Sequence, residues 1–207
     1  LSIEDNPTGG NTYWLKNEAV SLFDGSFNRE LVTPVVSPEP TATFHGEAFD
    51  SQTYYLLSPY QENATYKSGV VSATVPVEQI PVKDGISHQS LLALGTVSPE
   101  GNAVPSTVLK SAVAFVKLPF TSSSEVSRID FSAIGGETLA GNVELSLNGD
   151  IPECGDGENT VSSVALAQTY GTFGEGTYYL CVRPADLSEG YKLSFTLKDG
   201  TLKVIRD

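Results

Sequence analysis

The stretch from Thr107 to Ile134 constrains the fold of this chain most, because it carries the strongest hydrophobic pattern in the sequence. Its first half is almost continuously apolar, which is typical of a central strand covered on both faces. The apolar residues there are Val108, Leu109, Ala112, Val113, Ala114, Phe115, Val116 and Leu118. We expect Pro119 to end this strand and the polar run 121–124 to form an exposed turn.

A second apolar set follows in the same stretch, at Val126, Ile129, Phe131 and Ile134. The two halves are therefore predicted to pair as a hairpin. Val113 and Phe115 should lie in the core, beside strand neighbours from the alternating segment 191–197.

Short strand-like runs with turn signals between them fill most of the remaining chain. They occur at 13–23, 41–49, 54–57, 70–77, 91–97, 138–147, 161–166, 178–182, 191–197 and 202–205. The runs at 41–49 and 54–57 are expected to form a hairpin, the Pro-rich segment 33–40 an extended connection, and the Gly- and acid-rich segment 148–160 a loop. No run keeps a helical period beyond a turn or two. About a dozen strands at this spacing predict an all-β fold, an antiparallel β-sandwich.

Length and charge limit the possible classes of protein. A chain of 207 residues fits one β-sandwich domain, which we place at 12–207 behind a flexible N-terminal segment at 1–11. The net charge of −13 disfavours nucleic acid and anionic lipid as partners. Every apolar run is far shorter than the roughly 20 residues that span a bilayer, so we expect no membrane insertion by this chain. It has no Met and starts at Leu1, which indicates a processed piece.

Two cysteines, Cys154 and Cys181, permit a single disulfide pairing. A bridge between them would stabilise the fold by roughly 3.5 kcal/mol in the chain-entropy model. The alternative is two reduced thiols, with Cys181 packed in a strand and Cys154 in a loop. The even count fits a secreted protein without requiring one, so both alternatives stay open at this point.

Few residues are placed for catalysis or metal binding. His45 and His88 are the only histidines, each without a nearby Cys or second His, and no G-x-S-x-G context accompanies them. Four carboxylates crowd one segment at Asp150, Glu153, Asp156 and Glu158, but their spacing does not match a calcium-binding EF-hand loop. We therefore expect a solvated acidic loop, no catalytic residues, no metal site and no cofactor.

Aromatic residues leave a binding function open. A sugar platform could be formed by Tyr13, Trp14, Tyr54, Tyr55, Tyr60 and Tyr66, although such residues in alternating strands usually pack in the core. A carbohydrate-binding surface module is accordingly the alternative function.

The order of segments resembles a known family. The segments are the one with Trp14, then Ala-Thr-Phe-His-Gly at 42–46, Tyr-Tyr-Leu-Leu-Ser-Pro-Tyr at 54–60, Leu-Lys-Ser-Ala-Val-Ala-Phe-Val-Lys-Leu at 109–118, the strand with Ile129 and Phe131, Leu-Ala-Gly at 139–141, Gly-Thr-Tyr-Tyr-Leu-Cys-Val-Arg-Pro at 176–184, and Asp-Gly at 199–200. Together, over residues 12–202, they resemble the N-terminal domain of the fimbrillin family of Bacteroidales.

That resemblance implies a transthyretin-like β-sandwich and a structural or adhesive role. It also implies export to the cell surface and outer membrane or fimbrium, with a lipid anchor in the precursor. Subunits of this family assemble when the terminal strand of one completes the sheet of another, which is β-strand addition in physical terms. Partners would be other fimbrial subunits or surface proteins, and the family has no catalytic residues to carry over.

Overall fold

The computed structural model describes residues 13–25, 27–48, 50–100 and 104–206. The predicted flexible segment at 1–11 lies outside this range. The described strands are β1 (Ala19–Phe23), β2 (Asn28–Val32), β3 (Tyr54–Ser58), β4 (Thr65–Lys67), β5 (Val70–Val75), β6 (Glu78–Gln79), β7 (Ala93–Val97), β8 (Lys110–Ser111), β9 (Ala114–Phe120), β10 (Val126–Ala133), β11 (Gly141–Asn148), β12 (Ile151–Asp156), β13 (Ser163–Ala167), β14 (Gly176–Val182), β15 (Tyr191–Leu197) and β16 (Leu202–Arg206). The one helical element among them is a short 3₁₀ turn, η1 (His88–Ser90).

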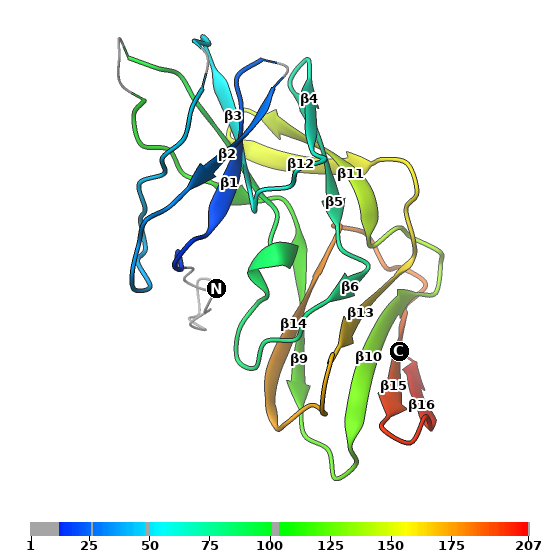
Figure 1. Ribbon diagram of the computed structural model, residues 1–207. Helices are drawn as coiled ribbons and strands as arrows, with labels where there is room; N and C mark the ends of the chain where they lie inside the picture. The colour runs from blue at the N-terminus through cyan, green and yellow to red at the C-terminus, as the bar shows by residue number, and fades with distance from the viewer. Residues whose placement is uncertain (1–12, 26, 49, 101–103, 207) are drawn as a thin grey trace.

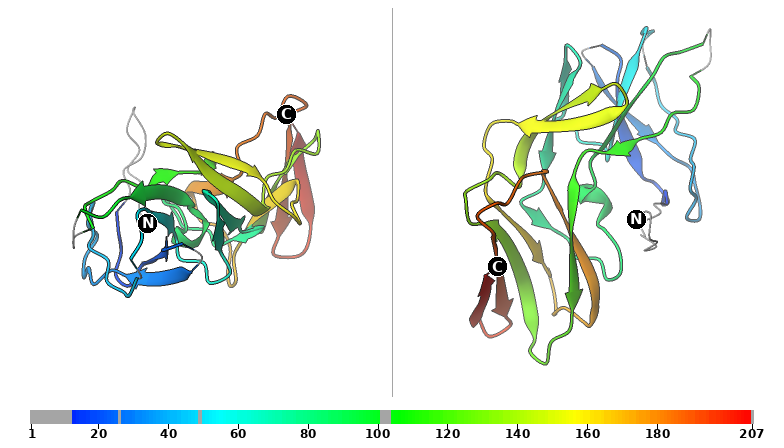
Figure 2. Two further views of the ribbon diagram at one scale, coloured as in Figure 1. Left: turned by 90° about the horizontal axis from the view of Figure 1, so that it is seen from above. Right: turned by 180° about the vertical axis from the view of Figure 1, so that it is seen from behind.

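Four sheets form two stacked halves (Figures 1 and 2). The first half contains the sheets β2-β1-β3-β7-β8 and β12-β11-β5-β4. In the second half, the five-stranded sheet β16-β15-β10-β13-β6 accompanies the two-stranded sheet β14-β9. All strand pairs are antiparallel apart from β13 with β6. This arrangement confirms the prediction of an all-β, antiparallel sandwich.

One cluster of buried side chains runs through both halves. It includes Phe23 and Leu57 from the first half and Ile129 and Leu180 from the second, each at most marginally accessible to solvent. Period-2 alternation explains this, because a strand between two layers turns every second side chain inward. The prediction of a single domain at 12–207 stays a prediction, and this shared core supports it.

The sheet β2-β1-β3-β7-β8 is covered on its outer face as well. A second cluster there contains Val20, Leu22, Leu31, Tyr54 and Val97, over which Trp14, Phe44, Leu56 and Leu109 pack. Segments without regular structure form this cover, held by the bridges Trp14–Glu39 and Val32–His45. Both faces of β1 are therefore buried, which explains its nearly continuous apolar sequence.

The predicted hairpin over 107–134 is wrong. β9 pairs with β14, whereas β10 pairs with β13 and β15, so the polar turn carries the chain from one sheet to another. Val113 is buried as predicted, but Phe115 is 43% exposed. Its strand has one apolar face rather than two, because β9 stands at the edge of a two-stranded sheet. The segment 191–197 accordingly pairs with β10 and meets β9 where Phe195 stacks on Phe120.

Pro119 does not end its strand as predicted. It lies inside β9 opposite Thr177, whose N–H and C=O bond to Asp84 on the other side of β14. The pair Pro119–Thr177 is therefore one of the pairs that exchange no backbone hydrogen bonds, and the missing N–H of proline costs the ladder nothing.

Two other segments differ from their predictions. Residues 41–49 contribute only the single bridge between Val32 and His45, so their predicted hairpin with β3 is wrong; β3 pairs with β1 and β7. The predicted loop 148–160 contains the strand β12, which pairs with β11 over six residue pairs. Glycine and carboxylate side chains suit this strand because its side chains lie mostly at the surface.

The core assignment gives a matched pair of stability predictions. Replacing the fully buried Ile129 by Ala should lower the free energy of unfolding by about 2–5 kcal/mol. Replacing Phe115 by Ala should lower it by only about 1 kcal/mol or less, because much of the ring is already in water. Urea denaturation of both variants measures the difference, and equal losses would contradict the edge position of β9.

Candidate functional site

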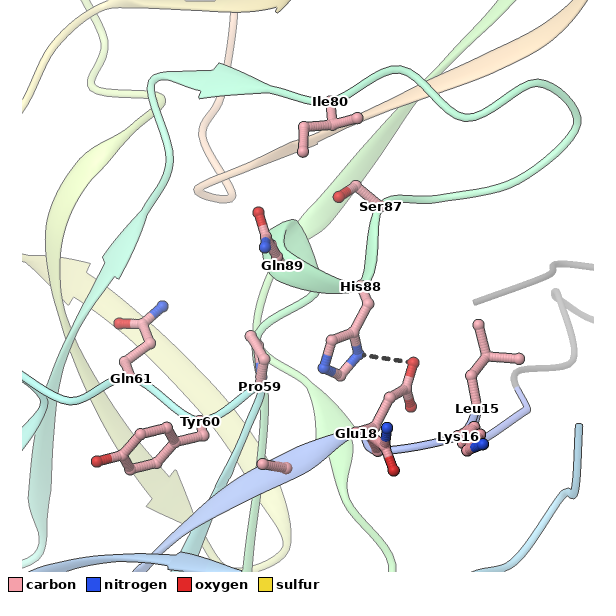
Figure 3. Close-up of a pocket in the computed structure, with 12 residues that line it drawn as sticks. Leu15, Lys16, Glu18, Pro59, Tyr60, Gln61, Ile80, Ser87, His88 and Gln89 are labelled. Carbon is pink, nitrogen blue, oxygen red and sulfur yellow. Dashed lines mark ion pairs between the residues drawn. The ribbon is translucent and has the colours of Figure 1, made fainter. Parts of the chain in front are cut away.

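A cavity of about 660 Å³ lies where the start of β1 meets the segment that contains η1. Its polar lining residues include Lys16, Asn17, Glu18, Gln61, Ser87 and Gln89, and its less polar ones Leu15, Ala19, Pro59, Tyr60 and Ile80, with His88 beside Glu18 (Figure 3). Four separate stretches of chain, near residues 15–19, 59–61, 80 and 87–89, build it.

Backbone hydrogen bonds hold these stretches in place. A turn at Lys16–Asn17 precedes β1, and Asn17 adopts a positive φ of 61°, which asparagine tolerates better than most residues. The N–H of Tyr60 donates to the carbonyl of Ala19 at 2.8 Å. In η1, the N–H of Ser90 donates to the carbonyl of Ser87 at 3.1 Å, which fixes the direction of His88 between them.

Glu18 and His88 form the titratable centre of the cavity. Nδ1 of His88 lies 3.1 Å from Oε1 of Glu18, and Figure 3 shows the two side chains pointing toward one another. Only 6% of the Glu18 side chain is exposed, against 22% for His88. Within the described residues neither carboxylate oxygen accepts a well-formed hydrogen bond. Burying a carboxylate is costly, and the nearby Nδ1 of His88 is the polar group that offsets part of this cost.

Burial shifts the pKa values of both groups in the direction that favours the neutral form of each side chain. It raises the pKa of Glu18, while the backbone of Leu15 acts in the opposite direction. It lowers the pKa of His88 to about 4. The 3.1 Å contact with a carboxylate would favour a protonated imidazole, but desolvation outweighs it here, so His88 is neutral at pH 7.

The cavity does not present a catalytic serine. Ser87 lines it, but the part of the chain that the structure describes shows no hydrogen bond from its hydroxyl to His88. Nucleophilic catalysis needs a nucleophile within hydrogen-bond reach of its base. The arrangement can accept a hydrogen-bond donor or a cation, and it offers no activated nucleophile.

The other residues singled out in the sequence lie apart from this cavity. His45 is exposed and bridges Val32 through its backbone. Asp156 binds Arg183 at 3.1 Å and Glu153 accepts from the amide of Asn148 at 2.9 Å, so these carboxylates have partners of their own. Among the described residues, no group of three His, Cys, Asp or Glu side chains is placed to hold a metal ion.

Three of the six aromatic residues of the proposed sugar platform, Trp14, Tyr55 and Tyr66, pack against other rings. Trp14 meets Phe44 edge to face at 4.8 Å, and Tyr55 lies against Tyr66 at 4.6 Å. Tyr54 is buried. Tyr60 alone lines the cavity. These aromatic residues therefore serve mainly to pack the protein interior, as aromatic residues in strands usually do.

Cys154 and Cys181 are both free thiols in the structure. Cys154 is half-buried on β12, and Cys181 is fully buried on β14, where its backbone N–H and C=O both bond to the side chain of Gln79. Burial raises the pKa of Cys154 to about 11 and that of Cys181 to about 12. The disulfide between them stays a prediction for protein isolated from cells.

Sequence reasoning missed Glu18 and the pairing of its side chain with His88. The available signal was a single carboxylate directly before the apolar run of β1, where a charge is out of place. A pattern in one segment could not show that η1, 70 residues later, brings an imidazole to it.

Comparison with known proteins supports the fold. No family model and no curated protein sequence matches this chain. A solved structure of a candidate cell adhesion protein from Bacteroides uniformis is similar over 94% of this chain and 80% of its own, with a TM-score of 0.57 and 15% identity. A second, from Bacteroides ovatus, covers 99% of this chain and 82% of its own, with a TM-score of 0.56 and 14% identity. At these identities the likeness shows a shared fold.

The low pKa of His88 predicts a pH dependence of stability. The unfolded chain takes up a proton on this histidine near pH 6.5, whereas the folded protein does so only near pH 4. Stability contributed by neutral His88 is therefore complete above pH 6.5 and is lost as the pH falls from 6.5 to about 4. In a His45→Gln variant the remaining imidazole can be followed by NMR.

In the His45→Gln variant, the free energy of unfolding should fall as the pH drops from 6.5 to about 4. The further substitution His88→Gln should remove the part of this fall that comes from His88. A measured pKa of His88 above 6.5 would contradict this prediction and show that the ion pair with Glu18 dominates.

The raised thiol pKa values predict slow alkylation. At pH 7.5 iodoacetamide should modify Cys154 far more slowly than free cysteine, and Cys181 should not react in the folded protein, because the thiolate is the nucleophile. A Cys154→Ser variant isolates Cys181, and its rapid modification would contradict the buried position. Thiol titration of the parent protein, unfolded without reductant, then counts the free thiols. The structure predicts two free thiols per chain, whereas a disulfide would leave none.

Proposed function

We propose that this chain is a structural or adhesive protein of the bacterial cell surface, a fimbrial subunit or fimbrillin-like adhesin domain that assembles by β-strand complementation. Its fold, shared over nearly the whole chain with two candidate cell adhesion proteins of Bacteroides, supports the adhesive role. The described residues contain no α-helix of the length and apolarity that crossing a bilayer requires.

The main observation in favour of strand complementation is that the two sheets in the second half differ in their number of strands. Five strands stand on one side and two on the other. On the inner face of the wider sheet Leu193, Phe195 and Leu197 are only half-buried. Ile205 shares that face because it pairs with Leu193, and it is 56% exposed. This inner face therefore has partly exposed apolar side chains, and Lys203, which pairs with Phe195, lies beside them on β16.

The strand β9 offers the backbone edge beside that face. In the part of the chain that the structure describes, its only strand partner is β14. Because Cys181 bonds to Gln79 away from β9, the pair Phe115–Cys181 exchanges no backbone hydrogen bonds. The N–H and C=O of Phe115 consequently point to the other edge of β9. An extended strand added there would continue the narrow sheet and cover the inner face of β15 and β16.

The donor strand comes from another chain or from a domain that this sequence does not include. β16 pairs with β15 over five residue pairs, so the terminal strand described here is already used within its own sheet. An alternating apolar peptide suits the acceptor, since every second side chain would enter the sandwich and the others would face water. The partners are accordingly cognate subunits with such a terminal strand.

Strand complementation predicts a rise in thermal stability. The chain alone should be monomeric or weakly dimeric, and a synthetic peptide with the terminal strand of a cognate subunit should raise its melting temperature by several degrees at about 100 times the dissociation constant. No rise with any cognate peptide at saturating concentration would show that the sheet needs no donor.

Two variants locate the acceptor face. Ile205→Lys places a charge on the inner face of β16 and should reduce the peptide's effect. Ile151→Lys changes a residue of the same type and similar exposure, 67%, on the edge strand β12, and should leave the effect unchanged. Equal loss in both variants would contradict binding at β9.

A further inference from the structure

We propose that two copies of this chain pair through β16, whose free edge forms an antiparallel, two-fold symmetric contact with the same edge of the second copy. β16 is the outermost strand of the five-stranded sheet, and among the described residues β15 is the strand that pairs with it. It stands at the margin of the molecule, with no other described element beyond it (Figures 1 and 2). This edge is separate from β9, so the contact does not depend on strand complementation.

The backbone hydrogen bonds of β15 alternate between its two neighbours. The N–H of Lys198, just after β15, donates to the carbonyl of Glu125 at 2.8 Å, toward β10. The N–H of Leu197 donates to the carbonyl of Thr201 at 2.8 Å, toward β16. Because these directions alternate along a strand, even-numbered residues of β15 bond toward β10 and odd-numbered ones toward β16.

This alternation fixes which backbone groups of β16 face outward. Ser194 lies opposite Val204 and bonds toward β10, so these two residues exchange no backbone hydrogen bonds. The N–H and C=O of Val204 therefore point away from β15. The same holds two residues away in each direction, for the backbone groups of Leu202 and Arg206. The free edge thus presents three residues with outward donors and acceptors.

These outward groups are complementary to themselves. When a two-fold axis passes beside Val204, this residue exchanges both backbone hydrogen bonds with Val204 of the second copy. Leu202 then exchanges its bonds with Arg206 of the second copy, and the symmetric pair does the same. Every outward N–H and C=O of the strand gains a partner, and the two five-stranded sheets become one continuous sheet.

The side chains of β16 suit such a contact better than they suit water. Leu202 is 59% exposed, Val204 46% and Ile205 56%, although all three are apolar. Lys203 donates to Oγ of Ser124 at 3.3 Å, so its ammonium lies over the turn before β10. In the dimer Val204 contacts its counterpart, and Ile205 lies beside the methylene stem of Lys203 from the second copy. The two Lys203 side chains do not face each other.

Other edge strands carry the features that usually prevent edge-to-edge pairing. β12 has a proline and two carboxylates, β4 and β8 are short and contain a lysine, and β2 carries two charged residues. These residues are Pro152, Glu153 and Asp156 on β12, Lys67 on β4, Lys110 on β8, and Arg29 and Glu30 on β2. A second copy is the partner that fits β16, because the same unprotected edge supplies both halves of the contact.

The association should be weak. A contact made by one strand from each copy is small against the roughly 1,200 Å² at the low end of stable interfaces, and two chains of net charge −13 repel one another. We expect a dissociation constant of about 0.1–1 mM in about 0.15 M salt. On a cell surface, effective concentrations of this order would pair neighbouring molecules. That last step rests on the proposed function, whereas the contact in solution does not.

Sedimentation equilibrium of the full chain tests the contact. Between about 10 μM and about 1 mM protein, the weight-average mass should rise from that of one chain toward that of two. A mass of one chain throughout this range would overturn the proposal, as would growth beyond two chains, because a two-fold contact closes on itself.

Charged variants locate the two-fold axis. Val204→Lys and Val204→Glu each place like charges opposite one another, and each alone should associate at least about tenfold more weakly than the parent. An equimolar mixture of the two should recover association, since residue 204 of one copy faces residue 204 of the other. Ile151→Lys on the edge strand β12 should associate as the parent does. A mixture no better than either variant alone, or an equal loss in Ile151→Lys, would overturn the proposal.

Two further measurements keep these results interpretable. The variants at position 204 should melt within a few degrees of the parent, because this side chain is already partly in water. Val204→Lys should also keep the rise in melting temperature that a cognate donor peptide gives. A failure of the β16 contact and a failure of strand complementation at β9 are therefore seen separately.

Discussion

The unequal width of the two sheets in the second half is the constraint on which much of this structure depends. A two-stranded sheet cannot cover five strands, so the core is dense where β14 and β9 lie over β13 and β10 and thin toward β15 and β16. β14 is tied down on its outer side by Gln79, Asp84 and the bridge between Gly85 and Tyr178. Among the described residues β14 is the one strand that pairs with β9, so Phe115 meets water and Pro119 is tolerated within the strand.

The sequence predicted the fold class and most strands because those depend on local alternation. β5, β7, β11, β14, β15 and β16 lie within a few residues of their predicted positions. Pairing was harder to predict. The apolar run 108–118 has the composition of a covered strand, but its environment is decided by where β14 arrives, about 60 residues later. A short polar turn is equally compatible with a hairpin and with a crossing between sheets, so the pattern alone could not separate the two.

The candidate site was less predictable for a related reason. His88 was visible as one of two histidines, but its partner Glu18 was not, because the two are joined only by the folding of distant segments. The acidic segment 150–158 was the more obvious candidate in the sequence, because it holds four carboxylates. In the structure Asp156 pairs with Arg183, and Glu153 accepts a hydrogen bond from Asn148.

The fold itself gives no reason to place a carboxylate at position 18. The backbone carbonyl of Glu18 accepts a hydrogen bond from the N–H of Thr33 at 3.0 Å. Any residue at this position could provide that carbonyl. Its side chain is buried against the sandwich, with one oxygen 3.1 Å from Nδ1 of His88, and burying this pair costs stability that an apolar side chain would not lose.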